Sequence, residues 1–123
     1  MSAVRVARSL PFCPSYPPFR RCPRNRGKLN TLIIPNRHVA SFFELTDAER
    51  RDLLKLVDAA KADIGREFAP QGYNIGINDG TAAGQTVPHV HIHLIPRYTG
   101  DSPDPRGGVR WIFPDKADYW SKP

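Results

Sequence analysis

The sequence predicts an α+β domain in which a small antiparallel sheet packs against one long helix. Residues 73–78 and 84–96 alternate apolar with small or polar side chains, which is typical of β-strands. Between the N-terminus and these strands, apolar residues recur every three or four positions, which is typical of an amphipathic helix. Two antiparallel strands and one packed helix are the elements of an α+β fold.

The first 28 residues depart from this regular pattern. They contain six arginines, five prolines and no sustained apolar period, so we expect no helix or strand there. An arginine-rich segment is also typical of organellar targeting peptides, but the prolines disfavour the amphipathic helix that such peptides form. Our hypothesis is a divergent or disrupted terminus, with N-terminal strands missing and a shifted reading frame that rejoins a regular pattern near Thr31.

Regular elements begin at Thr31. The β-branched and aliphatic run of residues 31–34 predicts a strand that Pro35 stops. Thr46 and Glu49 have the spacing of a capping box, which predicts the start of a helix. Pro70 and Gly72 end it. The apolar face of this helix consists of Leu53, Val57, Ala60, Ile64 and Phe68.

Three histidines alternate with aliphatic residues in the second strand segment, which follows a turn-rich connection over residues 78–84. His89, His91 and His93 therefore share one face of an extended chain, and Val90, Ile92 and Leu94 share the other. Three imidazoles at this spacing extend over about 13 Å, which suits an extended ligand such as a phosphate chain. Imidazole can also act as nucleophile, acid or anion clamp near neutral pH.

Alternate histidines on a strand can also bind zinc. However, no Asp, Glu or Cys occurs between Gly80 and Gly100 to complete such a site. A polar strand face with histidines by chance is a further alternative. Three of the four histidines within five residues argue against it. We therefore predict no metal in this site.

Composition and charge limit the classes of protein. The 123 residues suit one small domain, and no apolar run reaches the roughly 20 residues of a membrane-spanning helix. Cys13 and Cys22 are too few for a disulfide framework, so we expect a cytoplasmic protein. The net charge is +6, but residues 1–43 carry +8 and the remainder −2. Attraction to nucleic acid would therefore be local to the N-terminal segment, and a nucleic-acid partner is not expected.

The segment His89-Val90-His91-Ile92-His93-Leu94-Ile95 resembles the signature of the histidine triad nucleotide hydrolases and transferases. The resemblance extends to residues 78–80, 84–87 and 32–38, and it is closest to the microbial members and the dinucleoside polyphosphate hydrolases. It divides the chain into a basic segment of residues 1–29, a triad domain of residues 30–99 and a tail of residues 100–123. It also implies a nucleotide substrate, no cofactor and a homodimer.

The resemblance implies a role for each site residue. His91 would attack the α-phosphorus and form a covalent nucleotidyl-histidine, with its second ring nitrogen donating to a group such as a backbone carbonyl. His89 and His93 would flank the phosphate. Asn78, Gln85 and Thr86 would contact the ribose, the phosphate or the leaving group. Turn or strand roles are the structural alternative for these three polar residues.

Several positions depart from the family pattern. Leu29 and Asn30 occupy the place of a Gly-His pair whose histidine supports the triad. The early acidic or amide residue that holds the ribose hydroxyls in the family pattern has no candidate here, since no Asp or Glu precedes Glu44. Cys13 is the only cysteine left of a zinc-binding pair, so with His38 and His89 a four-ligand zinc site would be incomplete, and we predict no tight structural zinc.

Three functions therefore remain open: a nucleotidyl hydrolase or transferase, a nucleotide-binding module without turnover, and a nucleic-acid-associated protein that removes adenylate. The tail adds a further expectation. Its aromatic residues should pack against the protein's own sheet, although they could instead reach a partner. These residues are Trp111, Phe113, Tyr119 and Trp120.

Overall fold

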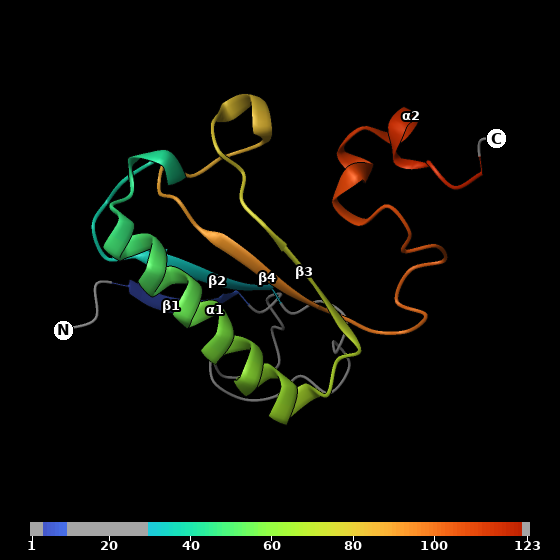
Figure 1. The fold of residues 1–123 in the computed structure, drawn as a ribbon, viewed down its shortest axis with the longest axis horizontal. Coiled ribbons are helices and arrows are strands. Elements are labelled where there is room, and N and C mark those ends of the chain that lie inside the picture. The colour runs from blue at the N-terminus through green and yellow to red at the C-terminus, as the bar shows by residue number, and fades with distance from the viewer. Residues whose placement is uncertain (1–3, 10–29, 122–123) are drawn as a thin grey trace, which may run out of the picture.

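The computed structural model describes residues 4–9 and 30–121, which form a four-stranded antiparallel sheet with one long helix across a face (Figure 1). The strand order is β1-β2-β4-β3. This arrangement confirms the predicted α+β class. The strands are β1 (Val4–Ser9), β2 (Asn30–Pro35), β3 (Gly72–Gly76) and β4 (Ile92–Arg97), the α-helices are α1 (Asp47–Phe68) and α2 (Pro114–Ala117), and the 3-10 turns are η1 (Phe42–Glu44), η2 (Thr81–Ala83) and η3 (Gly108–Ile112).

The strand β1 corrects the expectation that residues 1–28 contain no strand. It pairs with β2 over its whole length, from Val4 opposite Pro35 to Ser9 opposite Asn30. The alternation in Val4-Arg5-Val6 is too short to stand out in the sequence, and the pairing depends on the edge that β2 offers. Both cysteines lie outside the described residues, as do residues 1–3 and 10–29 of the segment for which we propose a disruption.

The helix α1 begins and packs as the sequence predicts. The Thr46 hydroxyl accepts a hydrogen bond from the Glu49 amide at 3.2 Å, and Glu49 Oε2 accepts one from the Thr46 amide at 2.9 Å. The helix ends at Ala69, which adopts the left-handed conformation at φ 46°. Leu53, Val57, Ala60 and Ile64 are buried, and Phe68 packs at the margin of the core.

Burial alternates along residues 89–96, as predicted, but the strand itself is shorter. Val90, Ile92 and Leu94 are at most 3% exposed, while the three histidines are half-buried. The strand β4 begins only at Ile92 because pairing with β2 stops at Ile33 opposite Ile92, and pairing with β3 stops at Gly76 opposite His93. Residues 84–91 therefore approach the sheet as a loop. For the same reason β3 ends at Gly76, two residues earlier than predicted.

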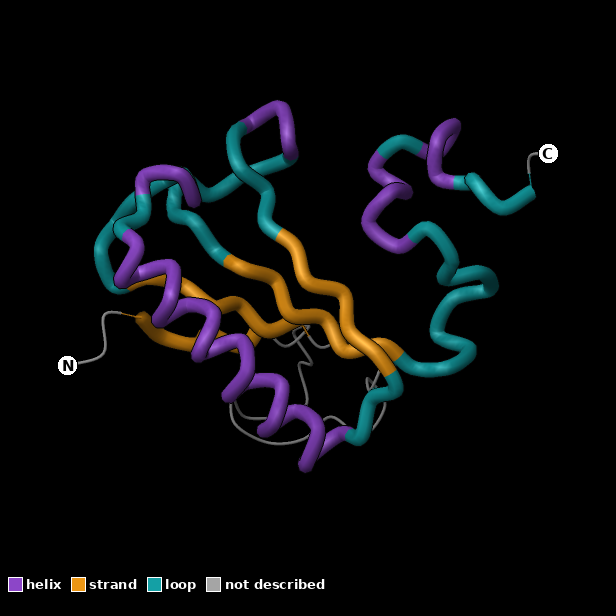
Figure 2. The backbone as a smooth tube through the Cα atoms, viewed as in Figure 1, coloured by secondary structure: helices purple, strands orange, loops and turns teal. Residues whose placement is uncertain are grey.

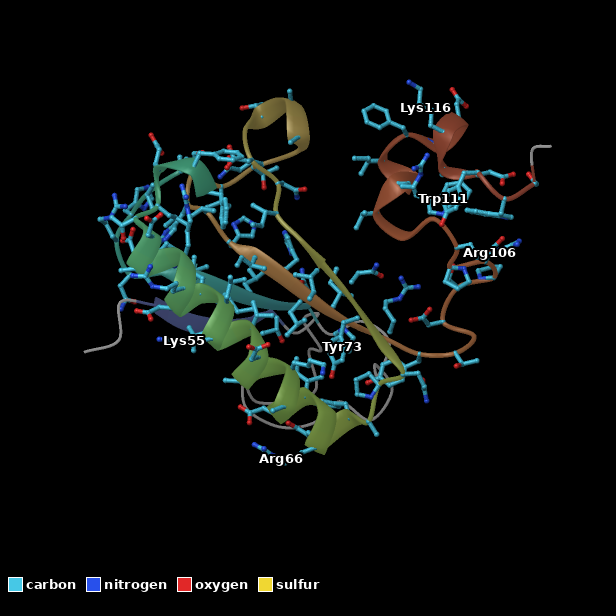
Figure 3. The ribbon with its side chains drawn as sticks, viewed as in Figure 1. Lys55, Arg66, Tyr73, Arg106, Trp111 and Lys116 are labelled. Carbon is cyan, nitrogen blue, oxygen red and sulfur yellow. The ribbon has the colours of Figure 1, made fainter. Side chains whose placement is uncertain are left out.

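The aromatic residues of the tail do not pack against the sheet as predicted, although η3 contacts β3, where Gly108 lies close to the Asn74 side chain. Figure 2 shows most of the tail to one side of the helix and the sheet, and Figure 3 places Arg106, Trp111 and Lys116 on it, away from Lys55 and Arg66 of α1. Phe113 and Tyr119 are 65% and 63% exposed. The aromatic residues find partners within the tail instead. Arg106 stacks on Trp120, Arg110 stacks on Tyr119, and Trp111 donates to the Arg106 carbonyl at 2.7 Å.

The loop after β2 is joined to α1 by an ion pair. Arg37 donates through Nε and Nη2 to the two carboxylate oxygens of Glu49, both at 2.8 Å. The Arg37 guanidinium and the Thr46 amide lower the pKa of Glu49 from 4.5 to about 2. Glu49 thus caps the helix and fixes the loop at once. Among the helices of the described residues, none has the length and apolar character needed to cross a membrane.

A buried hydroxyl in β2 generates a stability prediction. Thr31 is fully buried, and within the described part of the chain its Oγ1 has no hydrogen-bond partner. Thr31→Val keeps the shape and removes the unpaired polar group, so it should raise the free energy of unfolding by about 1 kcal/mol. Thr46→Ala, which removes a bonded hydroxyl, should instead lower it by about 1 kcal/mol. Urea denaturation measures both, and a destabilised Thr31→Val variant would show that the hydroxyl is satisfied in solution.

The ion pair predicts a pH dependence of stability. Because folding lowers the pKa of Glu49, its contribution is complete above pH 4.5 and is lost as the pH falls toward 2. Glu49→Gln should therefore be less stable than the wild type at pH 7, and the difference should shrink between pH 4.5 and 2. Denaturation curves at several pH values test this, with Asp58→Asn at an exposed position of α1 as the control. A difference that stays constant with pH would contradict the assignment.

Candidate active site

The histidines lie on the sheet face opposite α1. His93 is paired with Leu32 of β2 and Gly76 of β3, and pairing partners on neighbouring strands point to the same face. The apolar residues between the histidines point to α1 and join the core. Burying one face of this segment therefore leaves the imidazoles on the other, where a ligand can reach them.

His91 is oriented by a carbonyl of its own segment. Its Nδ1 lies 2.8 Å from the carbonyl oxygen of His89. A carbonyl only accepts hydrogen bonds, so the proton of a neutral imidazole is held on Nδ1. The lone pair is then on Nε2, which is the form of imidazole that can act as a nucleophile. A backbone carbonyl partner for His91 is what the sequence analysis predicts.

The two flanking histidines have different partners. His89 Nε2 donates to the Pro35 carbonyl at 3.0 Å, and its ring meets the edge of His38 at a centroid distance of 4.8 Å. His93 lies edge-to-face with His91, also at 4.8 Å. Burial and the neighbouring His91 lower the pKa of His93. His93 is therefore held toward its neutral form.

Asn30 contacts the triad directly from the first position of β2. Its Nδ2 lies 3.0 Å and its Oδ1 3.2 Å from His93 Nδ1. In the sequence, Asn30 is a departure, because it occupies the place of a histidine that supports the triad in the family pattern. In the structure, it supplies a hydrogen-bond partner to a histidine 63 residues away along the chain. Leu29 lies outside the described residues.

The loop after β2 holds the segment that precedes the histidines. The Val39 carbonyl accepts from the Val90 amide at 2.8 Å. Gln85 bridges two loops, because its Nε2 donates to the Ala40 carbonyl and its Oε1 accepts from the Gly80 amide, both at 2.8 Å. These contacts hold residues 80–90 in place where they have no strand partner.

Asp79 is a structural residue of the site that sequence reasoning missed. Its carboxylate accepts from the Ser41 hydroxyl at 3.0 and 3.1 Å and from the Phe42 amide at 2.6 Å. It therefore caps η1 from 37 residues away. The only signal in the sequence is the run Asn78-Asp79-Gly80, which indicates a turn and does not identify a distant partner.

The three predicted substrate contacts differ in their surroundings. Asn78 is exposed and follows Gly76 by two residues, and His91 precedes His93 by two residues. Because Gly76 and His93 form the last pair between β3 and β4, Asn78 and His91 occupy corresponding positions just beyond that pair. Gln85 uses both ends of its amide to join the loops. Thr86 is exposed in the connection to His89. The left-handed backbone at Gly80 and Gly84, with φ near 86° and 87°, shapes this connection.

Within residues 4–9 and 30–121, no three His, Cys, Asp or Glu side chains are placed so that they could hold a metal ion together. His38 and His89 do meet, but Cys13 lies outside the described residues. The arrangement that remains is a row of three imidazoles, each with one ring nitrogen at hydrogen-bond distance from a protein group. Such a row can present a nucleophile and hydrogen-bond donors to one phosphate group.

A family model described as the HIT domain matches residues 23–100. An uncharacterised HIT-like protein of Methanocaldococcus jannaschii is 43% identical over 79 residues, which are 64% of this chain and 59% of that protein. The Schizosaccharomyces pombe protein named bis(5'-nucleosyl)-tetraphosphatase (asymmetrical) is 46% identical over 72 residues, which are 58% of this chain and 40% of its own.

The fold matches solved structures as well. The crystal structure of a HIT family protein from Bacillus anthracis has a TM-score of 0.56 and 42% sequence identity, over 58% of this chain and 51% of that one. This chain thus spans between 40% and 59% of the length of these three proteins.

The Asp79 cap predicts local mobility on mutation. Asp79→Ala removes the acceptor of the Phe42 amide, so exchange of that amide should become roughly 5- to 150-fold faster, as expected for a loss of about 1–3 kcal/mol. Hydrogen exchange followed by NMR measures it. The Val90 amide, bonded to Val39, is the internal control and should change less. Equal acceleration of both amides would mean that Asp79 stabilises the whole domain and not this loop.

Proposed function

Because this chain belongs to the histidine triad family, we propose that it is a nucleotidyl hydrolase or transferase that cleaves a nucleotide phosphoanhydride or phosphoramidate at the α-phosphate. The observation that supports it best is the hydrogen bond between His91 Nδ1 and the His89 carbonyl. It leaves a nucleophilic nitrogen on a half-buried imidazole between two other histidines. The name of the fission yeast relative favours a dinucleoside polyphosphate among the candidate substrates.

The reaction proceeds in two displacements. His91 Nε2 attacks the α-phosphorus, a P–N bond forms, and the bond from phosphorus to the bridging oxygen or nitrogen breaks. The leaving group departs with the electron pair of that bond and takes up a proton. Water then attacks the same phosphorus, the P–N bond breaks, and the nucleoside monophosphate leaves with His91 restored. Splitting the reaction in this way replaces one difficult step by two easier ones.

The flanking side chains stabilise the charge that builds on the phosphate oxygens. His93 offers an N–H donor on one side of His91, and His89 flanks the phosphate on the other side, with its own N–H bound to the Pro35 carbonyl. Asn78 supplies a polar contact from the segment just after β3, at the position that corresponds to His91 on the neighbouring segment. Gln85 holds the loop through its hydrogen bonds and keeps one amide hydrogen available to the substrate. Thr86 offers a hydroxyl on the leaving-group side.

Nucleotide binding without turnover is the second candidate. One observation favours it: no acidic residue precedes Glu44, so the carboxylate that would hold the ribose hydroxyls is missing from the sequence. Weak nucleoside binding would then limit the reaction, even with the three histidines in a row. A nucleic-acid substrate has no such support, because the basic excess belongs to the N-terminal segment.

The proposal includes a cytoplasmic homodimer. Two cysteines do not suggest a disulfide framework, which fits a reducing compartment. Within the described sheet β3 is an edge strand, and Ile75 on it is 51% exposed. An edge strand with an exposed aliphatic side chain is suited to a second copy of the chain, although η3 of the tail contacts part of this strand.

The proposal predicts the effect of removing the nucleophile. His91→Ala should lower single-turnover release of AMP from adenosine phosphoramidate or diadenosine tetraphosphate by roughly 10³-fold or more, in excess EDTA. A base quench followed by intact-protein mass spectrometry should detect adenylated wild-type protein and no adduct on the variant, since phosphoramidates survive base.

Folding of the variant is checked by thermal denaturation and by binding of a fluorescent nucleotide. Nucleotide binding with no release by the wild type would establish the binding module instead. Release that persists in the His91→Ala variant would refute the assigned nucleophile.

A further inference from the structure

Asn30 and His93 form the closest side-chain contact between the triad and a neighbouring strand. Both ends of the Asn30 amide lie within 3.2 Å of His93 Nδ1. On its other side, His93 is paired with Gly76, which has no side chain. The partners of the His93 ring among the described side chains are therefore Asn30 on β2 and His91 on its own segment.

The two ends of the amide make opposite demands on the ring. The amide oxygen needs a proton on Nδ1, whereas the amide nitrogen needs a lone pair there. Nδ1 cannot satisfy both at once. The nitrogen is the nearer atom, at 3.0 Å against 3.2 Å for the oxygen. A lone pair on Nδ1 places the proton of the neutral ring on Nε2.

We propose that Asn30 is a positioning residue that donates a hydrogen bond to His93 Nδ1 and thereby holds the proton of His93 on Nε2. This inference rests on the proposed function in one respect, which is that the Nε2 proton of His93 binds a phosphate oxygen of the substrate. With the proton on Nδ1, the ring would instead present a lone pair that repels the phosphate. Because an amide does not titrate, Asn30 makes this contact at any pH near neutrality.

Adjacent histidines then carry opposite tautomers. His91 is protonated on Nδ1 and presents a lone pair, while His93 is protonated on Nε2 and presents a donor. The edge-to-face contact of the rings at 4.8 Å keeps the two functions side by side. One nitrogen attacks phosphorus while the other binds an oxygen of the same group.

Few titratable groups near His93 can influence where its ring carries the proton. In the described part of the chain, the titratable group beside it is His91, just before β4, and burial together with His91 lowers the pKa of His93. Arg97 lies further along the same face of β4 and is bound to Asp101 and Asn74. The tautomer of His93 therefore depends mainly on Asn30.

Long-range ¹H–¹⁵N correlation NMR of histidine-labelled protein at pH 7.5 reads the tautomers directly, with His93 assigned through a His93→Gln variant. The expected result is an Nε2–H tautomer for His93 and an Nδ1–H tautomer for His91. Finding Nδ1–H on His93 of the folded wild type would overturn the proposal.

A charge substitution tests the cause. Asn30→Asp offers only an acceptor, so His93 should move its proton to Nδ1 and raise its pKa by about one unit or more. The acidic limb of the pH profile of kcat/KM should shift in the same direction. Asn74→Asp places the same charge on the same face, next to Arg97, and should leave the His93 tautomer unchanged. Equal effects of the two substitutions would refute the contact.

Asn30→Ala provides a test that does not introduce charge. Without the donor, His93 should populate both tautomers, and an unchanged Nε2–H tautomer would also refute the proposal. The NMR measurement needs no turnover, so it tests the role of Asn30 separately from the proposed nucleotidyl hydrolase or transferase activity. Protein with the expected tautomers and no AMP release would retain the role of Asn30 and reject the proposed activity.

Discussion

The packing of Val90, Ile92 and Leu94 against α1 is the constraint on which the rest of the site depends. Side chains of an extended segment alternate between two faces, so burying these three residues leaves His89, His91 and His93 together on the other face. Each fully buried aliphatic side chain contributes about 2 kcal/mol. A shift of one residue would bury imidazoles and expose the aliphatic residues, which makes the orientation of the triad a consequence of core packing.

The hydrogen-bonded ladder of β4 does not extend to the first two histidines. His89 and His91 precede β4, and the loop after β2 replaces the missing strand partners. Backbone carbonyls of Pro35, Val39 and Ala40 accept hydrogen bonds from the segment of residues 85–90. In return, the loop donates the Phe42 amide to Asp79, which caps η1. Arg37 joins the same loop to the first turn of α1 through Glu49. The helix cap, the loop and the histidines therefore form one connected unit.

Each histidine is distinguished from the others by the partner of one ring nitrogen. Carbonyl acceptors fix the protonated nitrogen of His91 and of His89, and they select opposite nitrogens of the ring. Asn30 supplies an amide to His93. Three chemically identical side chains thus acquire different donors and acceptors toward a ligand. An arrangement of this kind suits a phosphate group, which needs one nucleophile at phosphorus and several donors at its oxygens.

The sequence by itself determined the features that depend on neighbouring residues. The capping box at Thr46, the apolar face of α1 and the alternation of residues 89–96 are local patterns, and each recurs in the structure because helix and strand periods are fixed by backbone geometry. Tertiary structure alone decided which distant groups meet. The pairing of β1, the start of β4, the Asp79 cap and the contact of Asn30 with His93 each join residues tens of positions apart. Trp111, Phe113 and Tyr119 stayed exposed, and partners within the tail, such as Arg110 against Tyr119, were available without the sheet. Strand pairing and long-range hydrogen bonds depend on the register of the folded sheet, which no local pattern encodes.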